Sequence, residues 1–203
     1  MEPDGYPTNW RAYASHVSTT GSKQFGFISN LADVNRFSAR FRAAACYRGV
    51  ILEGYSDATA KGYSALCRTL FTWSAFESFL VITEQALSTM TPCFQRYEGT
   101  EVAASIRKAD TENRFYAFIY ERVNPAHKRE LDSYFKDNPC NMGYLASAIR
   151  HIFAHGWLTP NANQVDPLVA VTICDSLCDF LLRVMDREFG SRVAIGLDNL
   201  IGR

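Results

Sequence analysis

The stretch from residue 57 to about residue 90 constrains the fold most, because large apolar side chains occur on nearly every side of a helix built from it. Ser56 or Asp57 can cap the start of this helix, and Thr91 with Pro92 is expected to end it. Its apolar positions include Leu66, Leu70, Phe71, Trp73, Phe76, Phe79, Leu80 and Ile82. A helix that is apolar all round has to be surrounded by other elements. The sequence therefore predicts a central, heavily buried helix.

Three further stretches repeat apolar residues at intervals of three and four, which is typical of amphipathic helices. They cover residues 27–51, 141–155 and 167–189. Asn141 is available as the N-cap of the second, and Asp166 with Pro167 provides a cap and a first residue for the third. The polar segment 93–140 predicts two or three shorter helices. They form a lid, a flank that contacts RNA, or a solvated excursion, which is a helical insertion that extends into solvent.

The chain shows no internal repeat and no apolar–polar alternation long enough to require a sheet. We therefore predict an all-α fold, an up-and-down bundle of two long central helices and two later ones, with an inserted helical segment. Residues 1–26 are expected to be a flexible lead-in, 27–190 the helical domain and 191–203 a tail with at most a short helix.

The formal net charge is zero, which argues against a large electropositive surface for nucleic acid and leaves room for a small cleft that contacts a few phosphates. A row of arginines in the stretch 27–51 is either a solvated helix face or a strip that faces RNA. The row consists of Arg36, Arg40, Arg42 and Arg48.

The six cysteines contain no C-x2-C pair, and the polar N-terminus has no signal-peptide pattern. No uninterrupted apolar run approaches the roughly 20 residues that cross a bilayer. We therefore expect a reduced, cytoplasmic protein that does not bind membranes. Cys174 and Cys178 lie one helical turn apart, but they lack the spacing of a zinc knuckle, so buried small side chains explain them better than a metal site. No metal and no cofactor are predicted.

One short helix carries the residues that are best suited to catalysis or ligand binding. Arg150, His151 and His155 lie in the apolar stretch 144–156, and Gly156 stands where helices often end. At about 100° per residue, His151 and His155 are about 40° apart on the helix, whereas Arg150 and His155 are about 140° apart. In a site that uses both Arg150 and His155, the end of the helix or a second copy of the helix therefore has to bring the two side chains together.

The hexapeptide from Arg150 to His155 resembles the Arg-x4-6-His signature of the HEPN superfamily, in which Asn, Asp or His usually follows the arginine. The segment from Trp73 to Glu77 is similar to an aromatic and acidic stretch of several HEPN subfamilies. The resemblance covers about residues 30 to 190. It implies a HEPN-like bundle and, in catalytic members, a composite site formed by two protomers.

Cleavage of RNA by its own 2′-hydroxyl needs proton transfer and charge stabilisation at the phosphorus, which histidine and arginine can supply. The resemblance implies a metal-independent endoribonuclease that acts as a homodimer on RNA, such as a toxin or phage-defence effector restrained by an inhibitory antitoxin protein. It implies His155 as general base or acid, Arg150 as phosphate ligand and His151 as an orienting auxiliary. The alternative is a non-catalytic HEPN module that binds a nucleotide or a partner protein.

Each of these residues also has a purely structural interpretation. His155 can interact with the last carbonyl groups of its helix, and His151 can be an ordinary surface residue. Glu77 lies among large apolar residues, where a buried carboxylate needs a partner. It is therefore expected either to hold Arg150 or another cation in place, or to face a cleft and take part in the site.

Overall fold

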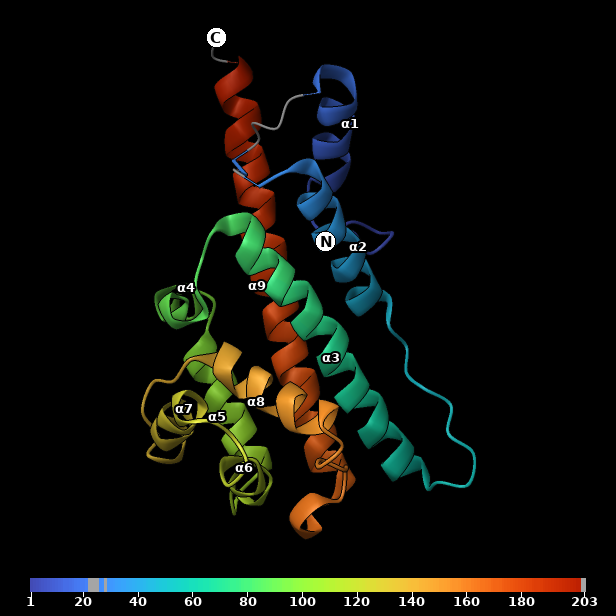
Figure 1. Cartoon of the computed structure of the whole chain (residues 1–203), viewed down its shortest axis with the longest axis vertical. Helices are drawn as coiled ribbons and strands as arrows, with labels where there is room; N and C mark the ends of the chain where they lie inside the picture. Colours follow the sequence, from blue (N-terminus) through green and yellow to red (C-terminus); the bar gives the residue numbers. More distant parts are fainter. Residues whose placement is uncertain (22–25, 28, 202–203) are drawn as a thin grey trace.

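The computed structural model describes residues 1–21, 26, 27 and 29–201, and every regular element in that part of the chain is helical (Figure 1). The prediction of an all-α fold is confirmed. The α-helices are α1 (Trp10–Thr20), α2 (Leu31–Cys46), α3 (Asp57–Thr83), α4 (Thr91–Arg96), α5 (Gly99–Ala109), α6 (Arg114–Tyr120), α7 (Pro125–Phe135), α8 (Met142–Ala154) and α9 (Pro167–Ile201). Two short 3-10 helices, η1 (Leu87–Thr89) and η2 (Ala162–Gln164), lie between them.

Helices α3 and α9 lie side by side and form the centre of the molecule, with α2 along α3 on one side and α8 on the other (Figure 1). Leu66, Phe76 and Phe79 of α3 are fully buried, as are Leu177 and Val184 of α9. The predicted central helix is therefore present, although α3 ends at Thr83 rather than near Met90. It ends there because Glu84 adopts a left-handed conformation, and Pro92 starts the next helix instead of ending this one.

Helix α3 is long and apolar enough to cross a membrane by length and composition, which differs from the expectation that no stretch qualifies. However, 56% of its most apolar window is buried inside the protein. The core helix of a soluble protein passes the same test, so this feature is weak evidence for a membrane span. The cytoplasmic location stays a prediction.

The N-terminal segment was expected to be loose, and this expectation is wrong for its described part. Helix α1 packs against the distal half of α9, and Tyr13 is only 2% exposed between Phe27 and Phe189. Asp186 of α9 accepts hydrogen bonds from the Thr8 backbone and the Met1 amino group. Residues 22–25 and 28 of the expected lead-in and first helix lie outside the described residues.

The expected tail after residue 190 is also different, because α9 continues as one helix to Ile201. Phe189 and Val193 are fully buried, so the contacts with the N-terminal region extend the packed part of α9 past the predicted end. Residues 202 and 203 of the tail lie outside the described residues.

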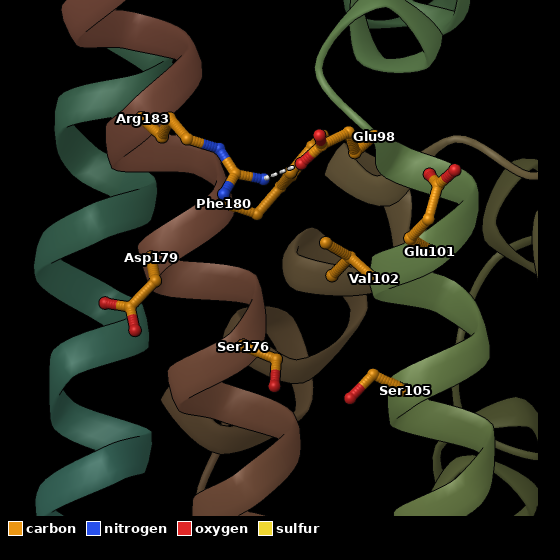
Figure 2. A pocket seen from close by; sticks show the side chains of 8 residues that line it. All are labelled: Glu98, Glu101, Val102, Ser105, Ser176, Asp179, Phe180 and Arg183. Atoms are coloured by element: carbon orange, nitrogen blue, oxygen red, sulfur yellow. Dashed lines mark ion pairs between the residues drawn. The ribbon is translucent and has the colours of Figure 1, made fainter.

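The segment 93–140 forms four helices, α4 to α7, rather than two or three. Its buried residues Ile106, Phe115 and Leu131 belong to the same hydrophobic core as α3 and α9, so it is part of the domain and not a solvated excursion. Helix α5 packs on α9, where Val102 and Phe180 lie between the two helices and Glu98 pairs with Arg183 at 3.9 Å (Figure 2).

Candidate functional site

Helix α8 presents its polar residues on the surface because its other side is buried. Leu145, Ile149 and Ile152 are fully buried, and the helix packs against α3, α7 and α9. The helix ends at Ala154, His155 is its C-cap, and the backbone N–H of His155 donates to the His151 carbonyl group. Gly156 has a φ of 75°, which is the left-handed conformation expected after a helix. The predicted helix is confirmed, and His155 is exposed at its end.

A row of aromatic rings runs from α7 to the end of α8. The rings of His127 and His151 are 6.5 Å apart and nearly parallel. His151 and His155 are 4.6 Å apart, with their planes at 73°. Trp157 follows, 6.1 Å from His155. We call these four residues the histidine row. His127 was not predicted, because no local spacing in the sequence connects position 127 with position 151. Trp157 was assigned to the loop after the helix and not to the site, although it follows His155 by two residues.

His127 is held rigidly by the cap of its own helix and by α8. Asn124 caps α7 with its side-chain oxygen, which accepts from the Ala126 and His127 backbone N–H groups and also lies 3.0 Å from His127 Nδ1. Since that oxygen only accepts, we assign the proton to Nδ1. His127 Nε2, 3.0 Å from Ser147 Oγ, then accepts from the serine hydroxyl. This arrangement holds a neutral imidazole at the inner end of the row.

Two histidines of the row resist protonation. Burial, and then the nearby His151 charge, lowers the pKa of His127 below its usual value of 6.5. Burial, and then the charges of His155 and Arg150, lowers the pKa of His151. Both imidazoles are therefore neutral at pH 7 and can accept a proton.

We expect the free energy of unfolding to fall as the pH drops from about 7 to about 5. The lowered pKa values mean that the unfolded chain takes up these protons at a higher pH than the folded chain does, so acid favours unfolding. Urea titrations across this range measure the slope, and the imidazole NMR signals of His127 and His151 should titrate below pH 6.5. Titration of both at or above that value would contradict the prediction.

Arg150 is half-buried on α8, and its guanidinium group makes no hydrogen bond or ion pair with any described residue. Its charge nevertheless acts on His151, the next residue. A cation without a protein partner, beside neutral imidazoles, is a suitable ligand for an incoming anion.

Glu77 does not have the buried position that the sequence suggested. It is exposed, and it lines a surface hollow of about 250 Å³ together with Arg36 and Arg40 of α2. Phe76, the preceding residue, faces Gly143 of α8, so the helical turn directs Glu77 towards α2. In the described part of the chain no ion pair joins Glu77 to Arg150.

Trp157 is 59% exposed, which is unusual for so large a side chain, and it borders an open hollow of about 710 Å³. Phe118, Glu121 and Arg122 form the rest of the border, and the Arg122 guanidinium lies 3.8 Å from the Phe118 ring centroid. The outer end of the row therefore offers an aromatic face and a second arginine.

Among the described residues, no group of three or more His, Cys, Asp or Glu side chains has the geometry of a metal site. Cys174 and Cys178 are buried core residues, and burial raises the pKa of Cys178 to about 11. Such thiols are protonated and poor metal ligands at neutral pH.

The fold and the site together define an all-α protein with two histidines, an arginine and an exposed tryptophan at the surface on and beside α8, and with the buried His127 behind them. Comparisons with protein families, curated proteins and solved structures find no match for this chain.

Proposed function

We propose that the protein is a metal-independent endoribonuclease of the HEPN type that cleaves RNA through attack by the 2′-hydroxyl group. The observation that carries this proposal is the pair of rings of His151 and His155, 4.6 Å apart at the surface end of α8. Arg150, beside them, has no hydrogen-bond or ion-pair partner among the described residues. Proton transfer near neutral pH and stabilisation of a phosphate are what this reaction requires.

The roles follow from the surroundings of each residue. His155 is exposed and reaches substrate, so it serves as general base or general acid. Arg150 binds the phosphate and stabilises the negative charge that develops on it in the transition state. His151 is neutral because of its lowered pKa, and it orients His155 or the substrate from one helical turn away. The exposed ring of Trp157 provides a surface on which a nucleobase of the RNA can stack.

The proposed active form is a homodimer. In a displacement at phosphorus, the attacking and leaving oxygens lie on opposite sides, so the base and the acid approach from opposite sides. His151 and His155 are about 40° apart on one helix and act from the same side, whereas Arg150 is about 140° from His155. A second copy of α8 would supply the groups on the far side of the phosphate. In the cell, an RNase toxin or phage-defence effector of this kind would need an inhibitory partner protein.

We expect the purified protein to cleave a mixed RNA pool in excess EDTA at the same rate as in Mg²⁺, and to leave 2′,3′-cyclic phosphate ends. Both results follow from histidine chemistry without a metal. Product ends are identified by sensitivity to acid and to phosphatase, and the oligomeric state by sedimentation. Cleavage that EDTA abolishes and Mg²⁺ restores would contradict the mechanism. Absence of cleavage from a protein that binds RNA or nucleotide would favour the non-catalytic HEPN module.

A further inference from the structure

A further hollow, far from the histidine row in sequence, lies between the connection of α2 with α3 (residues 47–56) and the facing sides of α3 and α9. Its volume is about 500 Å³, within the range of small-molecule sites. Its polar lining residues are Tyr47, Arg48, Lys61, Ser64, Arg68 and Asp175. Three of these are cations and one is a carboxylate, so the hollow has a local positive charge in a protein whose formal net charge is zero.

One cation is already engaged and two are free to bind a ligand. Arg68 donates to Asp175 at 2.9 Å and to Asp179 at 2.5 Å, and these bonds hold its side chain at the wall. Arg48 is exposed, and among the described residues its side chain hydrogen-bonds only to the Ala45 and Tyr47 carbonyl groups, both at 3.3 Å. Lys61 is exposed and makes no ion pair or hydrogen bond within the described part of the chain. Both side chains can therefore turn to an anion without breaking an ion pair.

The connection that carries Arg48 is fastened to α3, so the hollow has a defined shape. The Val50 backbone N–H donates to Ser64 Oγ at 3.1 Å. Gly49 has a φ of 120°, and a Cβ atom there would lie only 3.2 Å from Ser64 Oγ. The ring of Tyr47 packs against Phe71 at 5.3 Å. Burial raises the pKa of Tyr47, so its hydroxyl group keeps its proton and can donate.

The hollow between α5 and α9 shows the opposite charge pattern (Figure 2). It is lined by Glu98, Glu101 and Asp179, and its one arginine, Arg183, pairs with Glu98. An anion would be repelled there. The two hollows beside α9 therefore differ in the sign of their lining charge.

We propose that the hollow between residues 47–56, α3 and α9 binds a small phosphorylated molecule. Arg48 and Lys61 contact the phosphate, Arg68 supports it from the wall, and Tyr47, Ala65 and Val171 contact the remainder of the ligand. Charge-assisted hydrogen bonds from two cations suit a phosphate dianion better than a single-charged carboxylate. The concave shape favours a small molecule over a nucleic-acid strand, and the site does not depend on the proposed RNase activity.

Isothermal titration at low salt, with inorganic phosphate, AMP, ADP and adenosine as probes, tests this proposal on the full chain. The wild-type protein should bind AMP or ADP and not adenosine, and binding of inorganic phosphate alone would show that the phosphate group is sufficient. The double variant Arg48→Ala/Lys61→Ala should lose at least about tenfold in affinity. The control Lys108→Ala/Arg187→Ala removes the same charge from exposed positions outside the hollow and should bind like the wild type.

Three results would overturn the proposal. They are equal binding of adenosine and AMP, equal losses in the two double variants, and no binding of any phosphorylated probe by a wild-type protein that circular dichroism shows to be folded. Tight binding of an RNA strand at this hollow without binding of AMP or ADP would also overturn it, since the surface would then recognise nucleic acid.

Discussion

The His155→Ala variant is expected to cleave RNA at least about a hundredfold more slowly than the wild-type protein, because general acid–base catalysis by one group contributes factors of about 10² to 10⁴. The side chain is exposed at the end of α8, and its ring lies beside only His151 and Trp157 in the described structure. Its removal therefore leaves the core intact, and circular dichroism and the urea midpoint should stay close to those of the wild type.

A second measurement separates a catalytic role from a structural one. The charge of His155 is one of the causes that lower the pKa of His151, so the His151 imidazole should titrate at a higher pH in the variant. His16→Ala, on α1 at the opposite end of the molecule, is a matched control that should retain full cleavage. Full cleavage by a folded His155→Ala protein would remove this residue from the mechanism.

Asn141→Ala is expected to lower the free energy of unfolding by about 3 kcal/mol, because it combines a lost helix cap with unsatisfied buried partners. Asn141 is 1% exposed, and its side-chain oxygen accepts from the Gly143 and Tyr144 backbone N–H groups. Its amide nitrogen donates to the Leu87 carbonyl group at 2.8 Å and to Thr91 at 3.2 Å. One side chain therefore joins the start of α8 to the segment after α3.

Asn30→Ala is the matched control, since Asn30 caps α2 in the same manner but on the exposed surface. It should cost only about 1 kcal/mol. Asn141→Asp keeps the cap acceptor but replaces the donor to Leu87 with a buried carboxylate oxygen that faces the same carbonyl group, so it should also be clearly less stable than the wild type. Urea denaturation measures all three variants, and equal losses for Asn30→Ala and Asn141→Ala would show that the buried bonds contribute nothing.

Local patterns predicted the elements that carry the motif. The apolar periodicity, the Asn141 cap and the glycine at 156 defined α8 from residues that are neighbours in the chain. The apolar residues on all sides of α3 likewise predicted its central position. These inferences succeed because helix formation and capping depend on side chains three or four positions apart, which the sequence displays directly.

The sequence of α1 shows the same helical periodicity. Trp10, Tyr13 and Val17 recur at helical intervals, yet the polar and Pro-rich composition around them suggested a loose segment. The rings of Trp10 and Tyr13 lie 6.2 Å and 6.0 Å from the ring of Phe189, which is far along the chain. A short helix is marginal alone and is stabilised by packing, so its order depends on the far half of α9.

Local sequence patterns therefore predicted the helical class, the buried centre and the position of Arg150, His151 and His155 on and at the end of one short helix. Tertiary packing places His127 against His151, directs Glu77 towards α2 and brings Arg48 and Lys61 to one hollow. These contacts join positions far apart in the chain. They depend on how the helices cross and pack, which is set by the whole core together and leaves no periodic signal in any one segment.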